Sequence, residues 1–249
     1  MHFFLLIYGL LLGSFYNVVG LRVPLKQSIV KPRSSCPGCG HTLTAMELIP
    51  VMSYLFQGGK CSHCRERISP LYPLMEAATG VLFVISYSII GWEWELLVAL
   101  TLVSLFMIIL VSDIKYMIIP DKVLLFFSGL FLLEKILIPL GSRWDSLAGA
   151  ALGFGLLLLI AVISKGGMGG GDIKLYALIG FVLGVKPMLL SFFLATLFGA
   201  VIGIIGLAAG FFERKKPIPF GPFIAVGTLI SYFYYENIIN WYLSLLLGF

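Results

Sequence analysis

Three observations predict an all-α integral membrane protein, with about eight transmembrane helices and a cytoplasmic zinc-ribbon-like loop between helices 1 and 2. The chain of 249 residues is 59% hydrophobic and 12% charged, whereas soluble domains are about 45–50% apolar and about 25% charged. Several apolar runs approach or exceed the roughly 18–20 residues with which a helix crosses a bilayer. All four cysteines lie in one polar stretch, residues 22–73.

The first span covers residues 1–21 and forms the first predicted segment. It lacks the basic start and the small-residue cleavage site of a signal peptide, so we interpret it as a retained helix. The polar stretch 22–73 is the second predicted domain, and residues 74–249 form the transmembrane core. Seven further spans are expected in that core: 74–91, 96–112, 121–140, 146–164, 172–187, 188–210 and 221–246. Proline disfavours the helical region for the residue before it, so LGVKPM (183–188) predicts the turn between the sixth and seventh spans.

The distribution of basic residues predicts the orientation. Seven of the 17 lysines and arginines lie in 22–73, and seven more fall in loops or helix ends on the same predicted side, the run ERKK (213–216) among them. Only Lys135, Arg143 and Lys186 remain for the other side. Because such residues collect in cytoplasmic loops, the polar stretch is expected to face the cytoplasm. The net charge of +5 therefore reports topology in a lipid bilayer. Without a basic stripe that includes aromatic residues, no nucleic-acid partner is expected.

The cysteines form two C-x2-C pairs, CPGC (36–39) and CSHC (61–64). Paired knuckles of this kind supply four thiolates for a tetrahedral zinc ion. Two disulfides or free thiols are the alternatives, but disulfides rarely persist in the reducing cytoplasm. A mixed ligand set that includes His41 or His63 also stays open. Four thiolates leave no open coordination position, so the expected Zn²⁺ is structural and folds the loop. The predicted ligands are Cys36, Cys39, Cys61 and Cys64.

Two aspartates fall at the predicted cytoplasmic ends of spans, and thus at one membrane depth. These are Asp113, in VSDIKYMIIPD, and Asp172, in GGMGGGDIK. Ionisable groups in a span are costly and usually functional. The plain alternative is that each is solvated at the interface or pairs with Lys115 or Lys174. The glycine-rich run 166–171 favours a functional site, because glycine permits close backbone approach and irregular backbone at this depth lines a cavity.

A pair of carboxylates that shares one proton is the working unit of an aspartic protease. One acid protonates the scissile carbonyl while the other activates water, since two like charges this close do not both ionise. The sequence holds neither H-E-x-x-H nor G-x-S-x-G, the signatures of zinc and serine hydrolases. Acid pairs also serve proton-coupled transport, so the chemistry alone leaves a transporter as the alternative. No inverted repeat of the kind many transporters contain is evident.

Five stretches, in order, resemble the type IV prepilin peptidases, which are membrane aspartic proteases of the GxGD class. GSFYNVVGLRVP (13–24) is similar to the N-terminal signature of that family. CPGC with IPVMSYLFQGGKCSHC, followed by RISPLYPLMEAATG (67–80), is similar to its zinc loop and the next helix. DIKYMIIPD (113–121) and GGGDIKL (169–175) are similar to its two catalytic motifs.

The resemblance implies that the protein cleaves the basic leader from prepilins or pseudopilins at the cytoplasmic face of a bacterial inner membrane. It implies an S-adenosyl-L-methionine-dependent N-methylation of the new N-terminal residue, and a peptidase without methyltransferase activity is the alternative within the family. By similarity the catalytic residues are Asp113 and Asp172, and Gly59 is associated with methylation. Active-site support is expected from Gly169, Gly171, Lys174, Lys115, Pro120 and Asp121.

Three further polar residues each have more than one possible role. Glu76 either hydrogen-bonds within the helix bundle or caps its helix at the interface. Asn17 is expected to hydrogen-bond between helices rather than act in catalysis. Asp121 is expected to cap the helix that follows Pro120.

A further alternative is a membrane-anchored scaffold whose zinc loop binds partners. That function would leave the glycine run and both aspartates unexplained.

Overall fold

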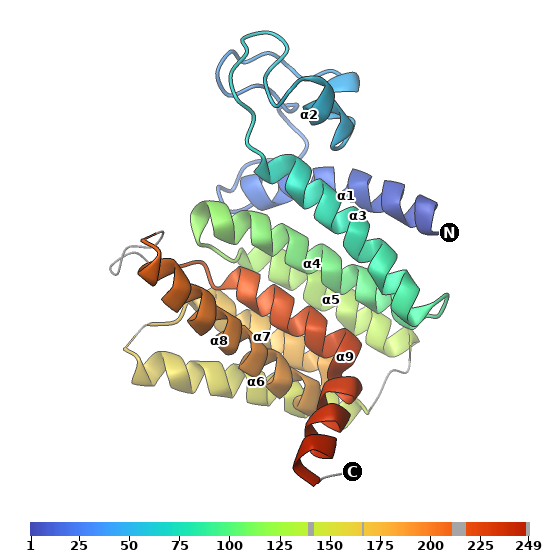
Figure 1. Ribbon diagram of the computed structural model, residues 1–249, viewed down its shortest axis with the longest axis vertical. Coiled ribbons are helices and arrows are strands. Elements are labelled where there is room, and N and C mark those ends of the chain that lie inside the picture. Colours follow the sequence, from blue (N-terminus) through green and yellow to red (C-terminus); the bar gives the residue numbers. More distant parts are fainter. Residues whose placement is uncertain (139–141, 166, 211–217, 248–249) are drawn as a thin grey trace. The chain divides into compact units, whose positions relative to one another are not determined.

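The structure is a computed structural model that describes residues 1–138, 142–165, 167–210 and 218–247. The described residues are helical apart from loops and two isolated β-bridges, so the all-α prediction is confirmed. The basic run 213–216 and Gly166 lie outside the described residues. In chain order the helices are α1 (His2–Arg22), η1 (Met46–Leu48), α2 (Met52–Phe56), α3 (Leu71–Ile90), α4 (Glu95–Tyr116), α5 (Asp121–Leu137), α6 (Arg143–Ile163), α7 (Gly170–Leu183), α8 (Val185–Ala208) and α9 (Gly221–Leu247) (Figure 1).

Within the described residues, five helices are long and apolar enough to cross a membrane, namely α1, α3, α4, α6 and α8. α7 has 14 residues. At 1.5 Å per residue it reaches about 21 Å, short of the roughly 30 Å hydrocarbon core. α5, with 17 residues, reaches about 26 Å. A helical multi-pass protein follows from the five, and the count of eight spans stays a prediction.

The break between the sixth and seventh predicted spans falls inside the predicted turn 183–188, at its glycine and not at its proline. α7 ends at Leu183 and α8 begins at Val185. Gly184 between them has φ 82°, which is the left-handed region that glycine adopts without a steric cost. Pro187 falls in the first turn of α8, where its missing N–H leaves no intrahelical bond unmade. The glycine, not the proline, ends the helix.

The chain divides into two compact units, Met1–Val123 and Leu124–Phe249. The predicted boundaries at residues 21 and 73 separate helix from loop inside the first unit and stay a prediction. In the first unit α1 and α3 run side by side, and both contact α4 (Figure 1). A Cβ at Gly9 would lie 2.7 Å from the Cα of Gly80, and one at Gly13 would lie 2.8 Å from the Cα of Glu76. These glycines therefore let the two helix backbones meet.

In the second unit α6 packs against α7, and α8 packs against α9. A Cβ at Gly149 would lie 3.0 Å from the carbonyl carbon of Gly180, and one at Gly153 would lie 3.0 Å from that of Tyr176. Small residues thus bring α6 and α7 into backbone contact along two turns. Between α8 and α9 the buried hydroxyls of Ser191 and Thr228 lie 2.7 Å apart. That hydrogen bond joins the helices where no water is available.

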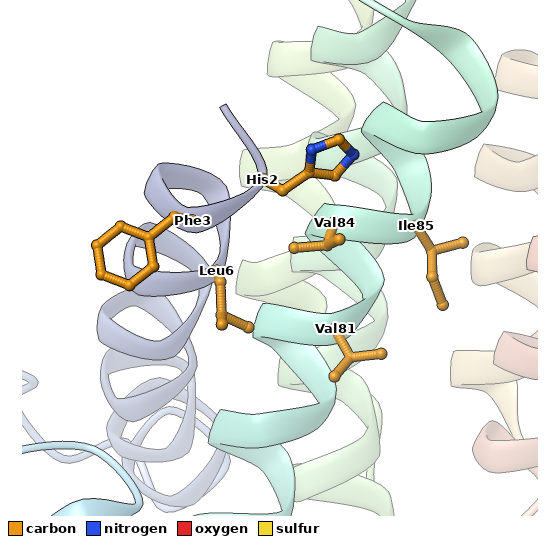
Figure 2. Close-up of a pocket in the computed structure, with 6 residues that line it drawn as sticks. All are labelled: His2, Phe3, Leu6, Val81, Val84 and Ile85. Carbon is orange, nitrogen blue, oxygen red and sulfur yellow. The ribbon is translucent and has the colours of Figure 1, made fainter.

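A shallow apolar pocket of about 380 Å³ lies between α1 and α3 (Figure 2). It is at the end of this helix pair opposite to the connection that holds the cysteines. Its lining is hydrocarbon except for the His2 ring, which makes an edge-to-face contact with Tyr87. The residues that line it are His2, Phe3, Leu6, Val81, Val84 and Ile85. The pocket holds no pair of acids and is not a candidate for hydrolysis.

Candidate active site and metal centre

The four cysteine thiols converge on one point. One ligand atom from each lies within 4.8 Å of all the others. The closest sulfur pairs, Cys36 with Cys64 and Cys39 with Cys61, are 3.6 and 4.0 Å apart. An S–S bond is about 2.05 Å long, so no disulfide joins them. Each close pair takes one cysteine from each knuckle, which is the arrangement of a four-thiolate metal site.

The two knuckles have the same backbone design. Each is closed by one antiparallel bridge, Ser35 with Thr42 and Lys60 with Arg67. The N–H of the first cysteine donates to the carbonyl five residues later, at 2.9 Å in the first knuckle and 2.8 Å in the second. The residue after each second cysteine has a left-handed backbone, with φ 71° at Gly40 and 63° at Arg65. The turns thus point all four sulfur atoms inward.

The thiols differ in how easily they ionise. Backbone N–H groups of Cys64 and His63 lower the pKa of the Cys61 thiol to about 6. At Cys64 the N–H of Glu66 acts in the same direction, but desolvation and the neighbouring thiols outweigh it and raise the pKa to about 12. Four thiolates at this spacing repel one another unless a cation lies between them. The donor set therefore fits a soft divalent cation such as zinc.

Glu47 ties the two knuckles together. Its carboxylate accepts hydrogen bonds from the Ser62 hydroxyl and from the Thr44 N–H and hydroxyl, the latter two at 2.8 and 2.9 Å. The Ser62 and Thr44 bonds lower its pKa to about 2. His41 lies 3.3 Å from the same carboxylate and stacks on His63 at 5.2 Å between ring centroids. Both histidines are thus engaged beside the cysteines, and the converging ligand group among the described residues is cysteine only.

Asp113 lies in the last turn of α4, the most deeply buried of the candidate spans in the described residues. Its side chain is 6% exposed. Met117 ends the helix with φ 55° and donates its N–H to the Asp113 carbonyl at 2.8 Å. Two residues earlier, at Val111, the Cβ would lie 2.7 Å from a Cβ placed on Gly20 of α1. The N-terminal signature thus packs directly against the helix turn that carries this aspartate.

Asp172 lies in the first turn of α7, where the partial positive charge of a helix N-terminus favours an acidic residue. Gly169 is the N-cap, with φ −70° and ψ 141°. A Cβ there would lie 2.9 Å from the Asp172 Oδ2. The carboxylate therefore folds back over a position that only glycine leaves open. Asp113 belongs to the first unit and Asp172 to the second, so their pairing stays a prediction.

The other predicted support residues surround the two motifs, and their roles stay predictions. Lys115 and Lys174 are exposed, each two residues beyond an aspartate. Pro120 is buried, and it directly precedes Asp121, which begins α5. Gly171 lies in the first turn of α7.

Gly59 has a clear conformational reason to be glycine. Its φ is 69°, and a Cβ would lie 2.9 Å from the Tyr54 ring. Its N–H donates to the Tyr54 carbonyl at 2.9 Å, and its own carbonyl accepts from the Ile68 N–H at 2.8 Å. Tyr54 fills the space beside Gly59, which therefore shapes a turn. Its link to methylation stays a prediction, and the geometry favours an effect through that turn.

Two buried residues were not predicted as parts of a site. Glu76 was left between two readings, and the structure buries its carboxylate in a hydrogen bond to the Val51 N–H at 2.7 Å. Tyr176 lies one turn after Asp172 on α7 and is fully buried, and its hydroxyl has no hydrogen-bond partner in the described structure. The i, i+4 spacing was the signal available in the sequence.

Comparison with protein families gives two adjacent matches. Residues 7–90 match the Bacterial Peptidase A24 N-terminal domain, and residues 99–204 match the Type IV leader peptidase family. The first match contains the four cysteines and Glu76, and the second contains Asp113 and Asp172.

Comparison with curated proteins gives relatives of nearly the same length. The chain is 47% identical to a Bacillus subtilis protein named prepilin leader peptidase/N-methyltransferase, over 98% of each chain. It is 33% identical to an Aeromonas salmonicida protein of that name, over 97% of this chain and 93% of the relative. It is 34% identical to one from Pseudomonas aeruginosa, over 95% and 91% respectively. No solved structure shows significant similarity to the chain.

Proposed function

The chain belongs to the type IV leader peptidase family, and from this premise we propose that it cleaves the basic leader from prepilins or pseudopilins and then N-methylates the new N-terminal residue. The single observation that carries the proposal is the 47% sequence identity to the Bacillus subtilis relative over 98% of each chain. The name of that relative includes both activities. The local geometry supports it, because Asp113 lies in the last turn of α4 and Asp172 lies in the first turn of α7.

Asp113 and Asp172 are the proposed catalytic pair. With one proton shared between them, one carboxyl protonates the carbonyl oxygen of the scissile peptide while the other takes a proton from the attacking water. The tetrahedral intermediate then collapses, and the amine leaves with a proton returned by the pair. No nucleophilic side chain is required. Gly169 supports this by leaving Asp172 room to turn toward the N-terminus of α7.

The substrate is proposed to reach the pair along the membrane surface. The basic leader is attracted to anionic headgroups on the cytoplasmic side. The apolar segment after the cleavage site lies in the bilayer, which brings the scissile bond to the interface. This requires the proposed orientation with residues 22–73 in the cytoplasm of a bacterial inner membrane, for which the distribution of basic residues is the support.

Zinc is the proposed metal, and Cys36, Cys39, Cys61 and Cys64 are its proposed ligands. A closed four-thiolate site has no position for water or substrate, so the role is to fold the loop. S-adenosyl-L-methionine supplies the methyl group when it is bound. The chain's own task in that step is to hold the newly formed N-terminal amine unprotonated and close to the loop.

The test uses the purified full-length protein in a lipid or detergent environment, with a pilin-like substrate that a known relative processes. Intact mass of the product is measured with and without S-adenosyl-L-methionine. We expect loss of the leader in both samples and the added mass of one methyl group only with the donor. Leader loss without methylation would leave a peptidase alone. An unchanged substrate would contradict the proposal and favour a transport role for the acids.

A further inference from the structure

A buried acid joins the four-cysteine loop to the membrane helices. Glu76 lies in the second turn of α3, and its side chain is 8% exposed. Its Oε2 accepts a hydrogen bond from the Val51 N–H at 2.7 Å. Gly13 of α1 lies against the same residue, since a Cβ on that glycine would lie 2.8 Å from the Glu76 Cα. Three segments far apart in sequence thus meet at Glu76: α1, α3 and the loop that carries the cysteines.

The acid holds the loop at a strained residue. Val51 is the N-cap of α2 and has φ 61° and ψ −49°. A β-branched residue pays a steric cost at positive φ, so it adopts such a backbone only where its surroundings hold it there. Glu76 supplies such a hold, because a buried carboxylate without a hydrogen-bond donor is unfavourable.

A continuous hydrogen-bonded segment runs from this residue to the metal site. α2 begins at Met52, and its Tyr54 carbonyl accepts from the Gly59 N–H at 2.9 Å. Gly59 in turn accepts from Ile68, and Cys61 follows two residues later. Between Val51 and the second knuckle the backbone has no long free stretch. A restraint at Val51 therefore also restrains Gly59.

We propose that Glu76 is a positioning residue for methyl transfer: its carboxylate fixes the segment 51–61 on the α1/α3 pair, and without it the loop moves while the peptidase site is kept. This rests on the proposed function for the link to methylation. The restraint itself rests only on the contacts above. The adjacent bond from the Asn17 amide to the Tyr72 carbonyl, at 3.1 Å, supports α3 one turn away but does not touch the loop.

The test compares Glu76→Ala and Glu76→Gln in the full-length, metal-loaded protein. A matched control is Tyr16→Phe, which removes a buried hydrogen bond of 2.6 Å to Ser104 in the same unit without touching the loop. Two readouts are taken: the rate of limited proteolysis within residues 51–61, and the masses of products from a pilin-like substrate. Glutamine keeps an oxygen that can accept from Val51, so it serves as the rescue variant.

For Glu76→Ala we expect loop proteolysis to rise about tenfold, from the loss of a hydrogen bond to a buried acceptor. Leader cleavage should stay within about twofold, and the methylated share of cleaved product should fall about tenfold or more, since small misplacements of reacting groups are costly. Glu76→Gln and Tyr16→Phe should match the wild type in the rate of loop proteolysis and in the methylated share of the cleaved product.

Three outcomes would overturn the inference. These are an unchanged methylated share in Glu76→Ala, an equal loss of cleavage and methylation, or a Glu76→Gln variant as defective as the alanine variant. If Glu76→Ala does not accumulate, Glu76→Leu, which removes the acceptor for the Val51 N–H but keeps most of the side-chain volume, must show the same selective loss of methylation. If the wild type itself leaves the substrate intact, the proposed function fails, while the proteolysis comparison still decides whether Glu76 restrains the loop.

Discussion

The Oδ2 of Asp172 occupies the space beside Gly169, so that a Cβ on that glycine would lie only 2.9 Å away. The neighbouring Gly170 has nothing within 4 Å of its corresponding position. The glycine-rich turn therefore does not need glycine equally at every position. At the N-cap, Gly169, a side chain would collide with the Asp172 carboxylate. At the first helical residue, Gly170, a side chain would meet no other atom.

We predict that Gly169→Ala lowers the rate of leader cleavage by about tenfold to a hundredfold, because the methyl group displaces the Asp172 carboxylate and such misplacements are costly in catalysis. The protein should still fold, since the carboxylate can turn toward solvent. Gly170→Ala is the matched control and should cleave at the wild-type rate. Single-turnover cleavage of a pilin-like substrate measures both. Equal effects of the two substitutions would show that the contact at Gly169 does not matter.

The two knuckles allow a paired prediction on stability. Gly40 and Arg65 occupy equivalent places with φ 71° and 63°, and a Cβ at Gly40 would touch nothing within 4 Å. A substitution at either position therefore acts only through the cost of the left-handed backbone conformation. Gly40→Ala should weaken the loop by about 1 kcal/mol, and Arg65→Gly should strengthen it by a similar amount. The chelator concentration that removes half of the metal reports both changes, and a shift of both variants in one direction would refute the equivalence.

Metal binding by the thiols predicts one metal ion per chain. Replacing any ligand, for example Cys64→Ser, should bring the bound metal close to zero and make the loop sensitive to protease, because a loop this short has no apolar core of its own. A chelator should have the same effect, and a reductant alone should have none. Loop opening by reductant without a chelator would instead point to disulfides. Elemental analysis and limited proteolysis distinguish the two.

Glu47 is expected to stabilise the folded loop at neutral pH and to lose this effect in acid. Its pKa in the folded loop is lowered to about 2 by the Ser62 and Thr44 bonds, below the ordinary value of about 4.3. A group with a lowered folded pKa contributes stability that is complete above the unfolded pKa and is lost as the pH falls toward the folded one. The difference in protease resistance between wild type and Glu47→Gln should therefore stay constant from pH 8 to about pH 5 and shrink only below about pH 4. A difference that disappears near pH 6 would contradict these contacts.

The elements that could be predicted from the sequence are those with a strong local signal. Apolar runs gave the helices, and the C-x2-C spacing gave a ligand group whose sulfur atoms converge within 4.8 Å. A positive φ at Val51 has no such signal, because valine is a poor residue for it. The Val51 N–H in this conformation donates to Glu76, 25 residues away. Long-range polar contacts of this kind depend on the packing of α1 on α3, which a local pattern does not contain.

Glycine in an apolar span did not show by itself which contact it makes. In α8 a Cβ at Gly203 would meet only the Ile218 side chain, at 3.9 Å, whereas in α9 a Cβ at Gly227 would lie 2.8 Å from the backbone of Ser191 and Ala195 in α8. Backbone contact of the same kind occurs between α6 and α7, and between α1 and α3. A glycine in a span shows where another backbone can approach. Which backbone does so is decided by the whole bundle.

The central claim is that Asp113 and Asp172 act as one catalytic pair, and leader cleavage by Asp113→Asn, Asp172→Asn and the double variant tests it most directly. Each single variant should accumulate and bind metal normally but lose about a thousandfold or more in single-turnover cleavage, and the double variant should be no worse than either single one, because residues that act as a unit are not additive. Near-normal cleavage by either single variant, or losses that multiply in the double variant, would contradict the pair.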